Sequence, residues 1–295
     1  LFDFELGLND EEPEAVDCIV FWTKDPAPML GGLDKLSSYP YYVQISITPY
    51  CKDIEANLRP KADIIKTVQA LSRRLGRRRV VWRYDPILLN GAYPIGFHLE
   101  WFKDTLEKLA PYVERCIISF IDLYAKARKN TQGLNLHELS EAEMEELAAG
   151  LSQIAKGSGV TLQTCSEKID LDRYGIGHGA CIDGGLVEHI TGKPVKVGKA
   201  KSQRPLCNCV ESFDIGAYDT CIHGCRYCYA NASAEKARQG FHEHDPRASV
   251  LTGELTGNEK ITVHEGERFP WKGRTLRVMF QVDSQFPNRI ACRVH

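Results

Sequence analysis

The sequence predicts an α/β fold in which parallel strands alternate with helices. Two observations predict it. Short apolar runs rich in β-branched and aromatic residues recur along the first two thirds of the chain, and segments with helical periodicity lie between them. This alternation is typical of a parallel sheet, which is either doubly wound or curled into a barrel.

Each predicted strand is a short apolar run that ends at proline or at polar residues. The strands are expected at 16–22, 41–48, 80–83, 116–121 and 161–165. Helices are expected near 61–76, 95–110 and 141–157, with a shorter one near 27–37. Ser140 and Glu143 have the spacing of a capping box, which indicates a helix that starts at residue 141.

The composition changes after about residue 170, where glycines crowd together, and changes again where a polar linker meets a cysteine-rich stretch. We therefore divide the chain into a βα unit over 1–190, a linker over 191–205 and a cysteine-rich segment over 206–268. A tail of unknown role follows over 269–295.

Composition and charge exclude several classes of protein. The chain has 295 residues, 43% of them hydrophobic, which is ordinary for a globular protein. A net charge of −2 argues against nucleic acid as a partner. No stretch approaches the roughly 18 apolar residues of a membrane helix, and the first residues do not resemble a signal peptide. We expect a cytoplasmic protein with no membrane partner.

Eleven cysteines are many for such a protein, and an odd number cannot all form disulfides. Cys18, Cys51, Cys116 and Cys165 are scattered along the chain and are expected to pack as small buried hydrophobic residues. Five of the others fall between Cys207 and Cys228.

Polar side chains follow the predicted strands, at the edge where parallel βα folds carry their chemistry. Arg83, Asp85, Asp122 and Glu167 are our candidates there for catalytic or cofactor contacts. The alternative is that they are ordinary polar residues of loops, most of which take no part in function.

Cys221, Cys225 and Cys228 have the spacing C-x3-C-x2-C. Three thiolates at this spacing can bind three irons of a [4Fe-4S] cluster and leave the fourth iron open to another ligand. Gly224 would let the backbone turn closely around the cluster, and Tyr227 would shield it.

Two alternatives depend on the nearby Cys207 and Cys209. Together with Cys225 and Cys228 they could form a four-thiolate zinc site in a binding module. Either one could instead complete the iron–sulfur cluster, and the protein would then transfer electrons or sense redox state without S-adenosylmethionine.

The C-x3-C-x2-C motif with an aromatic residue before its third cysteine resembles the cluster motif of radical S-adenosylmethionine enzymes. The resemblance implies a full or partial (TIM-like) βα barrel, S-adenosylmethionine chelated at the open iron, and hydrogen abstraction from a substrate of unknown kind. It also implies an electron donor such as a ferredoxin or flavodoxin. No Gly-Gly-Glu-like run, which usually holds the methionine amino group, follows the second predicted strand.

A longer resemblance covers about 16–265. The blocks that carry it are VDCIVFWTKDPAPML (16–30), QISITPY (44–50), VVWRYDPILLN (80–90), CIISFIDLY (116–124), CVESFDIGAYDTCIHGCRYCYAN (209–231) and HDPRASVLTGEL (244–255). With these blocks the chain resembles an uncharacterised prokaryotic family called domain of unknown function eighteen-forty-eight, noted for a C-terminal cysteine cluster like that of the radical enzymes. Family members begin with a further strand and a loop like SASRRTDIP, so an N-terminal βα unit is expected to be missing from this sequence.

Overall fold

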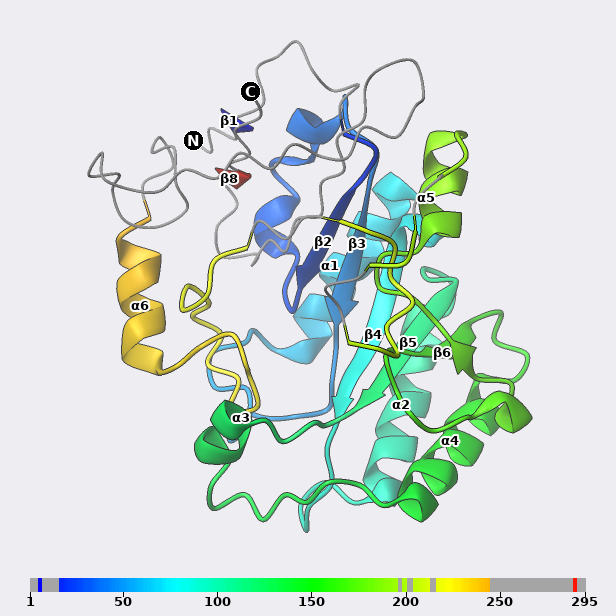
Figure 1. The fold of residues 1–295 in the computed structure, drawn as a ribbon, viewed down its shortest axis with the longest axis vertical. Helices are drawn as coiled ribbons and strands as arrows, with labels where there is room; N and C mark the ends of the chain where they lie inside the picture. Colours follow the sequence, from blue (N-terminus) through cyan, green and yellow to red (C-terminus); the bar gives the residue numbers. More distant parts are fainter. Residues whose placement is uncertain are drawn as a thin grey trace.

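A six-stranded parallel sheet forms the centre of the computed structural model, which describes residues 5–6, 16–195, 198–200, 204–212, 216–244 and 289–290. Its strands are β2 (Ile19–Thr23), β3 (Tyr41–Ser46), β4 (Val80–Ile87), β5 (Arg115–Phe120), β6 (Thr161–Thr164) and β7 (Gly177–His178). They lie side by side in this same order, each parallel to the next (Figure 1). All the loops that leave the strands therefore begin at one edge of the sheet.

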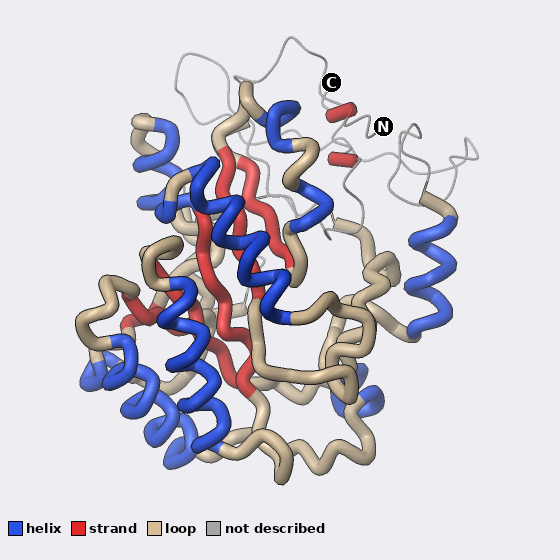
Figure 2. Tube along the Cα trace, turned by 180° about the vertical axis from the view of Figure 1, so that it is seen from behind, coloured by secondary structure: helices blue, strands red, loops and turns tan. Residues whose placement is uncertain are grey.

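Three helices of 15 residues cover one face of this sheet (Figure 2). They are α1 (Lys61–Leu75), α2 (Ile95–Leu109) and α4 (Glu141–Ala155). In α1 the buried residues Ile64, Val68 and Leu71 recur at helical spacing and so form one apolar stripe. Trp82 of β4 points to this face and stacks on Phe102 of α2, with ring centroids 4.8 Å apart.

The opposite face of the sheet carries a smaller apolar group and the polar residues that matter below. Because side chains alternate along a strand, Val81 and Arg83 point away from the three helices. Val81 packs with Tyr42 of β3 and with Leu186 of α5 (Gly184–Thr191). On this second face, the apolar side chains are buried, and the polar side chains lie nearer to the carboxyl edge of the sheet.

The α/β class and the main elements are confirmed. The three long helices begin at the expected residues and end within two residues of the expected ends, and the capping box of Ser140 and Glu143 forms. The five expected strands are present. β4 runs on to Ile87, past its expected end at residue 83, with a shift of register after Tyr84. Pro86 lies within that shift, where a residue without an N–H group does least harm to the ladder.

Other elements differ from expectation. The helix expected near 27–37 is a pair of 3₁₀ turns, Ala27–Met29 and Leu33–Leu36, separated by two glycines that disfavour a continuous helix. Several short elements were not expected, among them β7, α5, α3 (Ala125–Asn130) and α6 (Ala234–His242).

Part of the expected domain division lies outside the described residues, namely 245–268 and the 269–295 tail, apart from 289–290. The backbone of β8 (Arg289–Ile290) runs parallel to β1 (Glu5–Leu6). Within the described residues, the linker folds back on the cysteine-rich segment, since Lys199 and Val210 form an antiparallel bridge.

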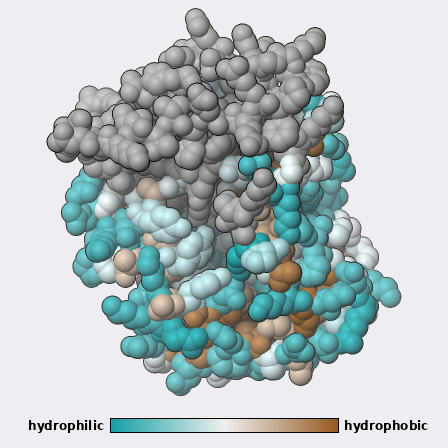
Figure 3. All heavy atoms as spheres, viewed as in Figure 1, coloured by the Kyte–Doolittle hydropathy of each residue, from teal (hydrophilic) through white to brown (hydrophobic). Residues whose placement is uncertain are grey.

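The surface carries both hydrophilic and hydrophobic side chains (Figure 3). On the face drawn in Figure 3, hydrophilic side chains border an area in the lower half where hydrophobic ones are visible. Among the helices that the structure describes, none has the length and hydrophobicity that a membrane span requires.

Candidate functional site

The loop that carries Cys221, Cys225 and Cys228 is docked on the segment that follows β3. Backbone contacts join the two segments: an antiparallel bridge between Glu55 and Cys225, and hydrogen bonds from Asn57 N to His223 O (3.0 Å) and from Arg226 N to Ile54 O (2.9 Å). The Asn57 side chain also donates to the carbonyl of Ile222, at 2.7 Å. The motif therefore lies at the carboxyl edge of the sheet although it follows all six strands in the chain.

The backbone of the motif has a feature that requires glycine. Gly224 has a φ of +70°, a conformation that L-residues rarely adopt. A Cβ atom there would also lie 3.0 Å from Nδ2 of Asn57. The amide of Cys228 donates to the carbonyl of Cys225 (3.1 Å), and the Asn231 side chain donates to the carbonyl of Cys221 (2.6 Å). Gly224 thus allows close docking, whereas its contact with a cofactor stays a prediction.

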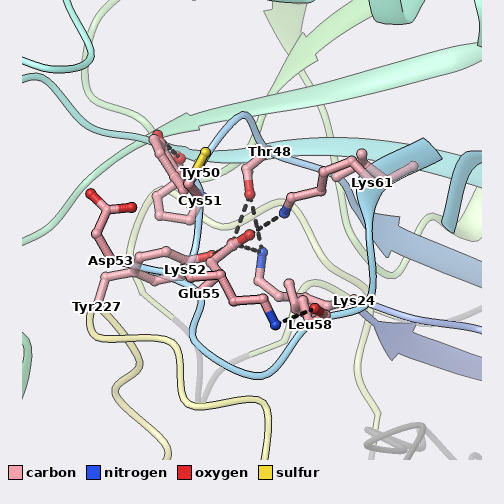
Figure 4. Close-up of polar contacts among 12 residues, drawn as sticks. Lys24, Thr48, Tyr50, Cys51, Lys52, Asp53, Glu55, Leu58, Lys61 and Tyr227 are labelled. Atoms are coloured by element: carbon pink, nitrogen blue, oxygen red, sulfur yellow. Dashed lines mark hydrogen bonds and ion pairs between the residues drawn. The ribbon is translucent and has the colours of Figure 1, made fainter. Parts of the chain in front are cut away.

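Glu55 lies at the centre of a buried polar network (Figure 4), and its backbone forms the bridge with Cys225. Its carboxylate is fully buried and accepts hydrogen bonds from Lys24 Nζ and Thr48 Oγ1, each at 2.7 Å. The ammonium group of Lys61 and the hydroxyl of Tyr227 also bind it. Residues that follow β2, β3 and the motif's second cysteine therefore converge on one carboxylate.

The charged groups of this network, Lys24, Lys61 and Glu55, have a net positive charge. Burial raises the pKa of Glu55, but Lys24 and Lys61 outweigh that effect and hold the pKa at about 2. Burial lowers the pKa of Lys24, yet attraction to Glu55 raises it overall. Burial also raises the pKa of the Cys225 thiol to about 12, an effect that Lys24 opposes. The two ammonium groups therefore offset only part of the effect of burial, and the Cys225 thiol stays protonated at neutral pH.

Tyr227 connects the motif to the core. Its ring packs edge-to-face on Tyr50, with centroids 6.0 Å apart, and Lys24 Nζ lies 5.3 Å from the ring centroid. Burial raises the pKa of its hydroxyl well above the ordinary value, so the hydroxyl stays protonated and donates to Glu55. The expected role of Tyr227 in shielding a cluster stays a prediction.

Arg83 and Asp85, two of the expected catalytic residues, form an ion pair on the second face of the sheet. The buried guanidinium of Arg83 also donates to Oε1 of Gln44 (3.2 Å) and to Sγ of Cys181 (2.8 Å). Burial lowers the pKa of Arg83, but Cys181 and Asp85 raise it well above the ordinary value. Arg83 is therefore a permanently charged group held by three partners.

Glu167 and Asp122, the other two candidates, lie near this pair. Glu167 accepts hydrogen bonds from Ser119 Oγ (2.7 Å) and from the amide of Phe120 (2.9 Å). Burial raises its pKa, and repulsion from Asp122 and Asp85 adds to the rise. Asp122 itself pairs with Arg204 at 2.8 Å. Since Asp85 also interacts with Lys24, the structure brings all four candidates to the edge where the motif docks.

The described contacts of Cys209 are with residues outside the motif. The amide of Ile182 donates to its sulfur (3.3 Å), and the thiol of Cys181 contacts it, whereas Cys225 contacts Glu55. Cys207 belongs to the same buried group as Cys209.

Four residues of these sites were missed by sequence reasoning or given another role: Glu55, Lys61, Cys165 and Cys181. Cys165 is buried, as expected, but its sulfur lies 3.0 Å from that of Cys181. Cys18 and Cys116 are buried as expected, whereas Cys51 is exposed because it begins the turn after β3. Glu55 and Cys165 had a local signal, since each follows a strand.

Within the described ranges, no three or more His, Cys, Asp or Glu side chains are already arranged to hold a metal ion. The cysteine side chains would therefore have to reorient before they could share a metal centre.

Comparison with known proteins identifies the family. The family model for Domain of unknown function (DUF1848) matches residues 8–230. The chain belongs to the DUF1848 family. The matched range contains the six-stranded sheet and all three motif cysteines, and it ends before the block at 244–255. No curated protein and no solved structure matched the chain.

Proposed function

We propose that this DUF1848 protein is an iron–sulfur protein in which Cys221, Cys225 and Cys228 hold a [4Fe-4S] cluster with one open iron. We further propose that it performs radical S-adenosylmethionine-type chemistry. The observation that supports this proposal best is the docking of the motif at the carboxyl edge of a parallel sheet, beside the cations Lys24 and Lys61.

The chemistry of the donor set fits such a cluster. Cluster ligation needs thiolates, and binding would release the protons that burial now keeps on groups such as Cys225. The net positive charge of Lys24, Lys61 and Glu55 would offset the negative charge that three thiolates bring. Gly224 allows the tight turn between the first two cysteines that close docking needs.

The order of the strands supports a partial βα barrel. A sheet whose strands follow chain order, with the long helices α1, α2 and α4 on one face and the short α5 on the other, is closer to a barrel segment than to a doubly wound sheet. In that arrangement the second face, with Arg83 and Gln44, would be the inside of the barrel. A motif late in the chain then reaches the site because every strand ends at the same edge.

A bound cluster would supply an electron to S-adenosylmethionine at its open iron, after reduction by a donor such as a ferredoxin or flavodoxin. The chain's own residues would bind and orient the cofactor and an unknown substrate. Arg83 offers a fixed positive charge, and Asp85 and Asp122 offer acceptors. Glu167, whose pKa is raised by burial, can hold a proton at its carboxyl oxygen to a higher pH than an ordinary glutamate.

The cluster is tested by iron and sulfide analysis of the full chain after anaerobic reconstitution. We expect about four irons per chain bound at the motif. Cys225→Ser should lose this iron, whereas Cys51→Ser, which changes an exposed cysteine outside the motif, should keep it. Equal iron and sulfide in Cys225→Ser and the unchanged protein would overturn the proposal.

A further inference from the structure

A second group of thiols lies on the face of the sheet opposite the three long helices. We propose that Cys165, Cys181, Cys207 and Cys209 bind one zinc ion. This proposal does not depend on the proposed function, because none of the four residues belongs to the C-x3-C-x2-C motif.

Two of these sulfurs are in contact and a third interacts with one of them, although they come from distant parts of the chain. Cys165 follows β6, Cys181 lies just before α5, and Cys209 lies in the cysteine-rich segment. The sulfurs of Cys165 and Cys181 are 3.0 Å apart, and the thiol of Cys181 also hydrogen-bonds that of Cys209. Cys207 is buried in the same group, two residues before Cys209. Convergence of four cysteines from three segments is the donor set of a structural zinc site.

The one sulfur–sulfur distance described is compatible with a single ion. In a tetrahedral zinc site with Zn–S bonds of about 2.3 Å, two sulfurs lie about 3.8 Å apart. The present separation of 3.0 Å between Cys165 and Cys181 is therefore less than about 1 Å from that geometry, a change that small side-chain rotations supply. A four-iron cluster would hold its cysteines on separate irons and needs the sulfurs farther apart.

The surroundings supply the charge and the hydrogen bonds that such a site needs. One Zn²⁺ with four thiolates carries two negative charges. The guanidinium of Arg83 lies 2.8 Å from Sγ of Cys181, and Arg204 interacts electrostatically with Cys165. The amide of Ile182 donates to Sγ of Cys209 at 3.3 Å. Donors of this kind orient and stabilise metal-bound thiolates.

The binding step balances without any oxidant. Four S–H bonds lose their protons to water, four Zn–S bonds form, and no sulfur changes its oxidation state. The carbonyl of Cys181 is already fixed by the Tyr42 hydroxyl (2.5 Å) and the Gln44 amide (2.8 Å), so one ligand is anchored to β3. Zinc would join the end of β6, the start of α5 and the cysteine-rich segment into one unit.

The test is metal analysis of the full chain produced with zinc and without iron–sulfur reconstitution. We expect about one zinc per chain, its loss in Cys181→Ser, and its retention in Cys225→Ser and Cys51→Ser. A second measurement avoids any folding defect of the variant: cobalt(II) added to the metal-free, unchanged protein should give the strong visible bands of a tetrahedral thiolate site, and zinc should abolish them.

Three results would overturn the zinc site. In the first, the unchanged protein contains no zinc and gives no cobalt bands. In the second, it contains iron and sulfide instead of zinc, and both are lost in Cys181→Ser. In the third, the mass of the protein is lower by about two hydrogens because Cys165 and Cys181 form a disulfide. A failure of the proposed motif cluster is distinguishable from these results, because the iron content would then be the same in Cys225→Ser and in the unchanged protein.

Discussion

Cys225 and Cys181 lie near the same edge of one parallel sheet, but their surroundings differ in kind. Cys225 lies against buried charges, with Glu55 bound by two lysines and by Tyr227. Cys181 lies against other thiols, with Arg83 as its one charged partner among the contacts described. Around Cys225, buried lysines can balance the negative charge of the three motif thiolates. Around Cys181, four cysteines lie in one buried group.

The difference suggests two kinds of metal chemistry in one chain. A set of three cysteines leaves a coordination position free, which suits a centre that must bind another ligand. A set of four closes the coordination sphere, which suits a structural ion. If the charged network is specific to the Cys225 side, changes within it should lower stability more than matched changes at exposed residues.

Glu55→Gln should have the largest effect on stability. The change leaves Lys24 and Lys61 buried without their carboxylate, which should lower the free energy of unfolding by about 3–5 kcal/mol. Urea denaturation of the full chain at neutral pH measures it. The matched control is Asp34→Asn, which breaks an exposed ion pair with Arg74 and should cost no more than about 1 kcal/mol. Equal losses in the two variants would contradict a buried charge network.

The same carboxylate predicts an acid dependence. Because the pKa of Glu55 is lowered from 4.5 to about 2 on folding, its contribution to stability is complete above about pH 4.5 and is lost as the pH falls toward 2. The Glu55→Gln variant lacks that component. The difference in unfolding free energy between the two proteins should therefore shrink on acidification, and a difference that stays constant from pH 6 to about pH 2.5 would contradict the assigned pKa.

Tyr227→Phe should have the next largest effect. It removes the hydroxyl that donates to Glu55 but keeps the ring against Tyr50, so we expect a loss of about 1.5–3 kcal/mol. Tyr218→Phe, at an exposed tyrosine, is the control and should cost less than about 0.5 kcal/mol. If both variants unfold at the same urea concentration as the unchanged protein, Tyr227 does not anchor the motif.

Gly224→Ala should cost about 1–2 kcal/mol, since alanine is strained at a φ of +70° and its Cβ would press on Asn57. Gly31→Ala is the control because Gly31 is exposed and its added Cβ would meet no atom within 4 Å. Thermal unfolding of the three proteins compares the two changes. A larger loss in Gly31→Ala would show that Gly224 is not needed for close docking.

Glu167→Gln should have the smallest effect, visible mainly as a change with pH. Because burial raises the pKa of Glu167, the folded state binds its proton more tightly than the unfolded state does. Its contribution to stability is complete below the ordinary pKa and declines as the pH rises through the raised one. The stability of Glu167→Gln relative to the unchanged protein should therefore increase with pH. A relative stability that does not vary with pH would contradict the raised pKa.

Local patterns predicted what depends on local sequence. Periodicity located α1, α2 and α4, and the spacing of Cys221, Cys225 and Cys228 identified the motif. β4 extends to Ile87 because it pairs there with β5, and the apolar pattern of residues 80–83 gives no information on that pairing.

The surroundings of the cysteines could not be predicted in this way. Glu55 and Tyr227 are 172 positions apart, and no spacing rule joins Cys165 and Cys181 to Cys209. These contacts arise because parallel strands bring their ends to one edge, whatever their distance along the chain. Sequence reasoning therefore found the residues after each strand but not the partners that bind them.

Electron paramagnetic resonance would show whether the motif holds a cluster with an open iron. The full chain, reconstituted anaerobically and reduced with dithionite, would be measured with and without S-adenosylmethionine. We expect a reduced [4Fe-4S] signal that shifts when S-adenosylmethionine is added and that is absent from Cys225→Ser. A cluster signal that S-adenosylmethionine leaves unchanged would rule out the open iron.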